Sequence, residues 1–376
     1  MKVLVVAAGY KPSTIYGGPT YSISALCEAL VEQDCAVTVL TTNANGKNDL
    51  EFKNETIDTI EGVEVKYCRR ATGDPVSFSP AHTWALLKYL SHYDLVHING
   101  WWNWVAIMSV LICKLFRKPY VLSPRGSLSR YTFNVKHSKK SKKILHSLFL
   151  RHLLKNSFFH VTSDVELLHC REAVSQFRYS SIPNLIDIPP LFHFSRENNK
   201  PFTMVFLGRI HPVKNIELLL SALKQLDFPF RMHFIGEGEQ EYVLKLKTMS
   251  RDDKRIQWHG SYEGEEKYRM LAQADLFVLL SHTENFGNVV IEALSQGTAV
   301  LVSRNVGASE LVEEHQLGWV IEPELKVCVD TLNKIYSERQ VLSDIRRRAP
   351  LIVQQILSPK SLSKRYIDEC YRAVYS

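Results

Sequence analysis

The chain has 376 residues, which is more than one hydrophobic core usually serves, so we expect two domains. A composition of 45% hydrophobic and 23% charged residues is typical of a globular protein and excludes a disordered chain. The net charge is +7, and the seven cysteines form no CxxC pair and no zinc-ligand spacing. We therefore expect reduced, unpaired thiols, as in a cytosolic protein.

No segment of this sequence is expected to be a secretory signal or to span a membrane. The apolar run at 3–8 is too short for a secretory signal and is followed by no cleavage site. The longest apolar run, 105–116, is interrupted by Ser109 and Lys114. Its apolar residues recur at helical spacing, which predicts a core helix.

The first half of the chain alternates apolar strands with amphipathic helices. Helices are predicted between most of the strands, for example at 20–32 and 81–90. This alternation predicts an α/β domain with a doubly wound parallel sheet. The predicted strands lie at 2–8, 36–42, 63–68, 95–98, 119–123, 158–162 and 179–182.

A segment of the first half concentrates positive charge. Between Gly126 and Ser163 there are eight Lys and Arg residues and no acid, so the segment carries +8 and the remaining chain −1. Apolar residues interleave with these cations at helical spacing. The pattern indicates a basic amphipathic helix for an anionic membrane surface or an acidic substrate, with a merely solubilising helix face as the alternative. No nucleic-acid-binding motif accompanies it, so we expect no nucleic acid partner. The cations are Arg130, Lys136, Lys139, Lys140, Lys142, Lys143, Arg151 and Lys155.

A polar, proline-containing stretch at 189–201 is predicted to be a linker, because the strand and helix alternation restarts after it. We therefore divide the chain into an N-terminal domain at 1–188, a C-terminal domain at 202–358, and a final helix at 359–376 that packs back towards the first domain. Two doubly wound domains place the natural ligand site in the cleft between them. The later strands are predicted at 202–207, 231–235, 256–259, 276–280, 298–302 and 319–321.

The most informative motif is a pair of carboxylates, Glu284 and Glu292, separated by seven residues. An apolar strand runs into this segment, and Gly287 between the two acids opens a helix. A helix N-terminus offers backbone N–H groups and a partial positive charge, which favour an anion. Carboxylates accept hydrogen bonds from sugar hydroxyls. Together these features indicate a ligand that carries both phosphates and sugars.

The first strand-to-helix turn does not support a nicotinamide cofactor. Residues 7–19 contain no GxGxxG sequence, and the second strand ends in Thr41, Thr42 and Asn43. An acid at that strand end would be needed to hold a ribose diol. We therefore expect no dinucleotide-binding domain.

Four motifs in order resemble the GT-B-fold, retaining glycosyltransferases of family 4. The resemblance spans nearly the whole chain and is strongest over 202–320. It implies two doubly wound, Rossmann-like domains that face each other across a cleft. The motifs are Gly17-Gly18 after the first strand, Gly208-Arg209 followed by Lys214, Gly236-Glu237-Gly238, and Glu284-x7-Glu292.

The resemblance implies a role for each motif residue. Arg209 and Lys214 would meet the donor diphosphate, where the leaving group develops charge, and so stabilise the transition state. Glu284 would hold hydroxyls of the donor sugar, and Glu292 would accept both ribose hydroxyls. Each residue also has a purely structural alternative. Arg209 and Lys214 would be surface cations, Glu284 a loop acid and Glu292 a helix acid, and the glycines would only form a turn. Further contacts to the donor would come from the backbone of Gly17, Gly18, Asn288, Val289 and Val290.

On the acceptor side, two residues of the first domain are candidates. His97 is expected at the end of a buried strand, facing the cleft, where it would orient the acceptor, with a packed core histidine as the alternative. Arg125 occupies the turn where many family members have a histidine near the reacting centre, so it would contact a phosphate or an acceptor anion instead. The tryptophans at 101, 102 and 104 would stack on a sugar ring or belong to the core.

The implied reaction transfers a sugar from a nucleotide diphosphate sugar to a hydroxyl group with retained anomeric configuration. A UDP-sugar is the expected donor, with GDP-mannose second. The leaving phosphate would take the acceptor proton in a front-face attack. Asp252-Asp253 lacks the strand context of a metal-binding DxD motif, so we expect no metal and no cofactor.

The expected acceptor is a lipid-linked oligosaccharide or lipopolysaccharide of bacterial surface-polysaccharide assembly, such as O-antigen or exopolysaccharide. The enzyme would be cytoplasmic and peripheral on the inner face of the plasma membrane, held there by residues 130–155. The alternatives are a nucleotide-sugar epimerase or a glucan phosphorylase on the same fold, and a catalytically silent, nucleotide-sugar-binding membrane scaffold.

Overall fold

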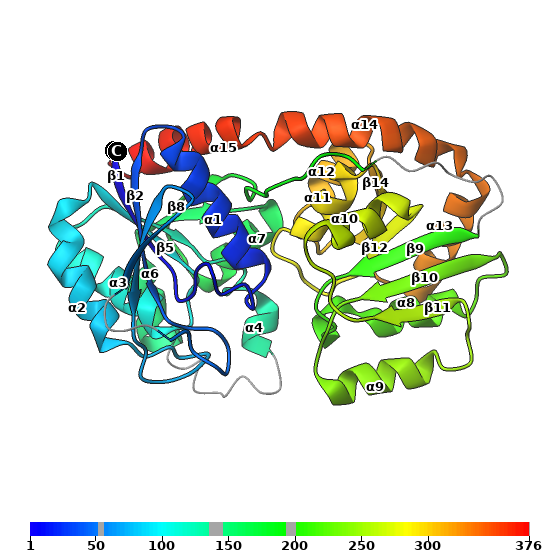
Figure 1. Cartoon of the computed structure of the whole chain (residues 1–376), viewed down its shortest axis with the longest axis horizontal. Coiled ribbons are helices and arrows are strands. Elements are labelled where there is room, and N and C mark those ends of the chain that lie inside the picture. Colours follow the sequence, from blue (N-terminus) through cyan, green and yellow to red (C-terminus); the bar gives the residue numbers. More distant parts are fainter. Residues whose placement is uncertain (52–55, 135–145, 193–200, 376) are drawn as a thin grey trace. The chain divides into compact units, whose positions relative to one another are not determined.

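The computed structural model describes residues 1–51, 56–134, 146–192 and 201–375. The chain forms two compact units, each built around its own sheet (Figure 1). Unit 1 combines Met1–Asp187 with Leu357–Ser376, and unit 2 is Ile188–Ile356. Across the described residues, no helix is both long and apolar enough to cross a bilayer.

Unit 1 contains an eight-stranded sheet in the order β3-β4-β2-β1-β5-β6-β7-β8. All neighbours pair in parallel except β3 and β4, which form an antiparallel pair. The central strands are buried on both faces, which explains their nearly continuous apolar sequences. The strands are β1 Lys2–Val6, β2 Ala36–Thr42, β3 Thr56–Ile60, β4 Val63–Cys68, β5 Leu95–Asn99, β6 Tyr120–Ser123, β7 Phe158–Val161 and β8 Arg178–Ser181.

Helices cover both faces of this sheet. Ser79, Asn103 and Ser163 start α2, α3 and α7, because each side chain accepts a hydrogen bond from a backbone N–H of the first turn. Side chains of α2, α3 and α6 share one hydrophobic core, and α1 lies on the opposite face (Figure 1). The helices are α1 Gly18–Val31, α2 Pro80–Tyr89, α3 Trp104–Leu115, α4 Arg130–Asn134, α6 Arg151–Leu154 and α7 Asp164–Ala173, with short segments η1 Leu90–His92 and the π-helical η2 His146–Leu150.

The C-terminal segment belongs to unit 1. It forms α15 Pro359–Arg365, the π-helical η4 Tyr366–Arg372 and η5 Ala373–Tyr375. Helix α15 packs on α1, and Tyr366 and Tyr371 of η4 are fully buried. Arg365 donates to the carbonyl oxygen of Ser181 at 3.0 Å, which ties the segment to the edge strand β8.

Unit 2 contains a six-stranded parallel sheet in the order β11-β10-β9-β12-β13-β14. Helices α10, α11 and α12 lie on one face of the sheet and α8 and α9 on the other (Figure 1). The strands are β9 Phe202–Leu207, β10 Phe230–Ile235, β11 Ile256–His259, β12 Leu276–Leu279, β13 Ala299–Ser303 and β14 Gly318–Ile321. The helices are η3 Pro212–Lys214, α8 Ile216–Leu223, α9 Gln240–Met249, α10 Gly264–Gln273, α11 Asn288–Ser295, α12 Ser309–Glu314, α13 Leu325–Ser337 and α14 Gln340–Ile356.

Two features differ from the sequence-based expectations or lie beyond them. Strand β3 was not expected, because its middle residues are exposed and it pairs only with β4. The basic segment at 130–155 is described only at its ends, where α4 precedes it and η2 with α6 follow. The lysines at 136, 139, 140, 142 and 143 lie outside the described residues. Arg130 forms an ion pair with Glu172, so its charge is compensated within the protein.

Candidate functional site

The sheet of unit 2 reverses its order between β9 and β12, and the residues implicated by sequence gather there. Strand β9 pairs with β10 on one side and with β12 on the other. In an open parallel sheet, the loops that leave the carboxyl ends of two such strands diverge and leave a ligand crevice. The β9 loop carries Arg209 and Lys214, and the β12 loop carries Glu284.

Lys214 and Glu284 meet directly at this switch point. The Lys214 ammonium group donates a hydrogen bond to Glu284 Oε2, although 70 residues separate them in the sequence. Backbone bonds fix both loops: His282 N–H donates to Val213 O at 2.8 Å, and Glu284 N–H to Asn305 O at 2.9 Å. An ammonium group has three donors, so Lys214 keeps two for a ligand while it orients Glu284.

Glu292 lies one helix further on, in α11, with only 8% of its surface exposed. Its Oε1 atom accepts a hydrogen bond from the Lys267 ammonium group at 2.9 Å. Its Oε2 atom is buried and has no hydrogen-bond partner among the described residues. A buried carboxylate oxygen without a donor is costly, so this atom is suited to accept a ligand hydroxyl.

Helix α11 begins directly after Gly287, which has a left-handed conformation with φ 89°. A Cβ atom at this position would lie 2.9 Å from Val306 Cγ1, so glycine is required sterically as well. The phosphate site expected at this helix start loses one of its three predicted backbone donors. Val290 N–H already donates to Gly287 O at 2.8 Å, which removes it from the set of available donors. Asn288 and Val289 are the first two residues of the helix.

Arg209 is exposed in the loop that follows Gly208. The β9 and β10 loops run side by side here, because Gly208 N–H donates to Ile235 O and Ile210 N–H to Glu237 O. A Cβ atom on Gly236 would lie 2.0 Å from Gly208 O, which explains the glycine of this turn. Burial lowers the pKa of His211, and the cations of Arg209 and Lys214 lower it further, so this histidine is held neutral.

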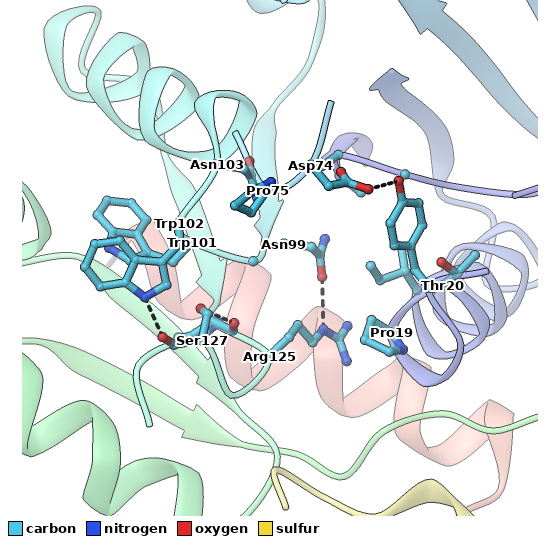
Figure 2. A pocket seen from close by; sticks show the side chains of 17 residues that line it. Pro19, Thr20, Asp74, Pro75, Asn99, Trp101, Trp102, Asn103, Arg125 and Ser127 are labelled. Atoms are coloured by element: carbon cyan, nitrogen blue, oxygen red, sulfur yellow. Dashed lines mark hydrogen bonds between the residues drawn. The ribbon is translucent and has the colours of Figure 1, made fainter. Parts of the chain in front are cut away.

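Unit 1 has its own switch point, between β1 and β5, and a pocket of about 340 Å³ opens there. Figure 2 shows Trp101 and Trp102 on one side of it, Asp74 on the other, and Asn99 with Arg125 between them. The volume falls within the range of small-ligand sites. Aromatic faces opposite a carboxylate suit a sugar ring, which has both apolar and hydroxyl-bearing surfaces.

Arg125 contributes a cation to this pocket. It has a left-handed backbone, with φ 54°, and its Nε donates to Asn99 Oδ1 at 3.2 Å. Its Nη1 atom donates to Asn184 Oδ1 and to Ser22 Oγ. These acceptors are neutral, and no ion pair within the described ranges includes Arg125. Asp74, the acid of the pocket lining, forms an ion pair with Arg70, so the charge of Arg125 favours an anionic ligand group.

His97 does not reach this pocket, and the acceptor role expected for it does not fit its position. It is the middle residue of β5 rather than its end, and it is fully buried. Its ring nitrogens bond with Tyr371 OH at 2.8 Å and Ser123 Oγ at 2.7 Å. Burial, and then the neighbouring His160 and Arg125, lower its pKa. His97 therefore serves packing against the C-terminal segment.

Gly17 and Gly18 begin α1, next to the pocket-lining residues Tyr16 and Pro19. Gly17 has φ 65° and precedes the first helical residue. A Cβ at Gly17 would meet no atom within 4 Å, so the positive φ alone accounts for glycine there.

Sequence reasoning missed Lys267, Asn99 and Asp74. The position of Asn99 at the end of a buried strand is a usable signal, since pockets form at such ends. Lys267 and Asp74 carry no such sequence signal. Lys267 reaches its site through the packing of α10 on α11, and Asp74 lies in a loop. In the part of the chain that the structure describes, no cluster of three metal-ligating side chains is present.

Solved structures with this fold are glycosyltransferases of the GT-B class. Sucrose-phosphate synthase from Thermosynechococcus elongatus matches the chain with a TM-score of 0.77 at 17% identity, covering 100% of this chain and 99% of that one. HepE of Anabaena, solved with UDP and glucose, matches with a TM-score of 0.73 at 19% identity, covering 99% and 100%. These similarities establish a GT-B fold of two parallel-sheet α/β domains.

Sequence comparison identifies the family. The family model of glycosyl transferases group 1 matches residues 187–351, and that of glycosyltransferase family 4 matches residues 16–188. The chain therefore belongs to the family 4 glycosyltransferases. A 2-deoxystreptamine N-acetyl-D-glucosaminyltransferase of Niallia circulans is 24% identical over 94% of this chain and 97% of its own length. Sulfoquinovosyl transferase SQD2 of Arabidopsis thaliana is 32% identical over 41% of this chain and 30% of its own length.

Proposed function

We propose that this glycosyltransferase transfers a sugar from a UDP-sugar to a hydroxyl of a lipid-linked saccharide, with retained anomeric configuration. The observation that carries the proposal is the group at the switch point of unit 2. There Lys214 and Glu284 are in contact, and Glu292 presents a carboxylate oxygen for which the described part of the chain offers no partner. Cations for a diphosphate and carboxylates for hydroxyls are the two kinds of contact that a nucleotide diphosphate sugar requires.

Each residue then has a role in binding or turnover. Glu292 accepts the ribose hydroxyls, and Glu284 orients the donor sugar. Arg209 and Lys214 neutralise the diphosphate as the bond to the anomeric carbon breaks, so they act most strongly in the transition state. The N-terminus of α11, with Asn288 and Val289, adds a partial positive charge. Gly17 and Gly18 allow close approach of the donor to the backbone.

Support for the donor comes from relatives and from the cationic side chains. HepE was solved with UDP and with UDP-glucose. Because these cations already neutralise a diphosphate, the proposed mechanism needs no divalent metal. The proton of the attacking hydroxyl passes to the leaving phosphate oxygen, on the same face of the sugar. A GDP-sugar such as GDP-mannose is the second candidate donor.

The pocket of unit 1 is the proposed acceptor site. Trp102 and Asp74 offer a stacking face and a hydroxyl acceptor, and Arg125 favours an acceptor that carries an anionic group. A lipid-linked oligosaccharide or lipopolysaccharide meets this requirement through its phosphates. WaaB, a lipopolysaccharide outer core galactosyltransferase, shares the fold with a TM-score of 0.67 at 17% identity. We propose bacterial surface-polysaccharide assembly as the setting, on the inner face of the plasma membrane.

Acceptor-dependent release of UDP tests this function. The purified protein is incubated with a panel of UDP-sugars and with a lipid extract as the source of acceptor, with Lys214→Ala as the control. Released UDP is measured, and NMR determines the anomeric configuration of the product. We expect release only with extract and a product of retained configuration. Inversion would refute the retaining mechanism, and epimerised donor without extract would indicate an epimerase. Binding without turnover would indicate a silent scaffold.

A further inference from the structure

Seven large apolar side chains of unit 1 are exposed on three elements, α2, α3 with the residue that follows it, and η2. Leu115 is 75% exposed, Phe149 66% and Phe116 58%, which is unusual for such residues in a soluble domain. None of the seven lines the pocket of unit 1. Together they form what we call the outer helix face, composed of Trp84, Leu87, Leu111, Leu115, Phe116, Leu148 and Phe149.

The three elements lie side by side. Helix α2 packs on α3, where Trp104 Nε1 donates to Thr83 Oγ1 at 2.9 Å. Helix α3 in turn packs on α6, which directly continues η2. Their inner faces share one buried core, so the residues of the outer helix face point away from it. Leu111 and Leu115 are four residues apart, which places them on one stripe of α3.

The elements that carry this face contain cations and no acid. Residues 75–163 include thirteen Lys and Arg residues and one acid, Asp94. Five of these cations lie outside the described residues. Of the others, Arg117, Arg151 and Lys155 are exposed on the same elements or directly after them. Among the residues with described positions, none of these three takes part in an ion pair.

We propose that the outer helix face docks on an anionic lipid bilayer. Apolar side chains on elements that carry cations and no acid match the two layers of a bilayer surface, acyl chains below and phosphates above. A protein partner would favour a face with charges of both signs at its rim. The inference deepens the proposed function, since it rests on a membrane-linked acceptor and names the surface that meets the membrane.

Vesicle binding tests this proposal without any need for turnover. Sedimentation is measured with phosphatidylcholine vesicles that contain about one third phosphatidylglycerol, and with phosphatidylcholine alone. The test variant is Leu115→Ser with Phe116→Ser. The matched control is Leu244→Ser with Leu351→Ser, two side chains of unit 2 that are 66% and 67% exposed. A third variant, Arg117→Gln with Lys155→Gln, tests the charge requirement. UDP binding is measured for each protein.

We expect the wild type and the control to bind anionic vesicles, and the Leu115 and Phe116 variant to bind them about tenfold less. The charge variant should lose the preference for anionic lipid. Equal vesicle binding by the wild type and the Leu115 and Phe116 variant would overturn the proposal, as would wild-type protein that ignores both vesicle types. A wild-type dimer that the same variant dissociates, seen by light scattering, would assign the face to a second copy and also overturn it. Unchanged UDP binding in a variant separates loss of docking from failure of the donor site.

Discussion

Lys214 carries the most demanding role at the scale of single residues, because it contacts Glu284 and faces the proposed diphosphate. Lys214→Ala should lower kcat about 10²- to 10³-fold, since a cation on the leaving group acts mainly in the transition state. Arg209→Ala should also lower kcat, and KM for the acceptor should change little in both. Lys245→Ala removes a surface ion pair with Glu217 in the same unit and should leave kcat unchanged. An unaltered kcat in Lys214→Ala would show that the charge role is wrong.

Lys267 holds Glu292 in place through its hydrogen bond to Oε1. Lys267→Met should weaken UDP binding roughly tenfold, because Glu292 loses the cation that orients its carboxylate. Calorimetric titration with UDP measures this, with Lys245→Met as the matched exposed lysine. Tighter binding in Lys267→Met would mean that Lys267 competes with the ribose instead of orienting its acceptor.

At the scale of elements, the start of α11 depends on Gly287. Gly287→Ala should reduce the free energy of unfolding by about 2 kcal/mol, since alanine is strained at φ 89° and its Cβ meets Val306. Urea titration measures the change. Gly260→Ala is the control, because a Cβ there meets no atom within 4 Å, and it should shift stability by less than about 0.5 kcal/mol. Equal stability of both variants would contradict this account of the turn.

The link between β5, β7 and η4 predicts sensitivity to acid. His97 and His160 are fully buried, and burial lowers the pKa of both, that of His160 to about 3. Unfolded histidines titrate near about 6.5, so below that pH the unfolded state binds more protons and stability falls. Each histidine should cost about 2 kcal/mol between about pH 6.5 and about pH 5.

Thermal unfolding followed across this pH range checks the expectation. The Tm should be level above about pH 7 and fall steadily below it. His92→Gln removes an exposed histidine of the same unit and should leave the profile unchanged. A level Tm down to about pH 5 would show that the buried pair is not neutral in the folded state.

At the scale of the whole molecule, the sequence was sufficient for the two sheets except strand β3, and partly sufficient for the site. The buried parallel strand β12 is apolar throughout, and β5 is apolar except for His97 and Asn99, so their sequences identify them. Strand β3 has an exposed middle and is held by one neighbour, so its sequence carries no such signal. Glu284 and Lys214 were predicted from motifs, and their contact follows from the adjacency of β9 and β12.

What the sequence could not predict depends on distant contacts. His97 resembles a functional strand histidine until Tyr371, 274 residues later, covers it. The partner of Glu292 lies on α10, and only the packing of α10 on α11 brings Lys267 there. Val290 N–H donates to Gly287 O in a local turn and is therefore not available to an anion. No residue type in the sequence indicates this hydrogen bond.

The central claim is that unit 2 binds a nucleotide diphosphate through Glu292 and its neighbours. Calorimetric titration of the wild type, Glu292→Gln and Glu217→Gln with UDP, GDP and ADP tests it most directly. We predict that UDP binds most tightly, that Glu292→Gln weakens binding about 10- to 100-fold through the lost charged hydrogen bonds, and that the surface variant Glu217→Gln matches the wild type. Absence of binding by every nucleotide, or equal UDP affinity in Glu292→Gln and the wild type, would contradict the account.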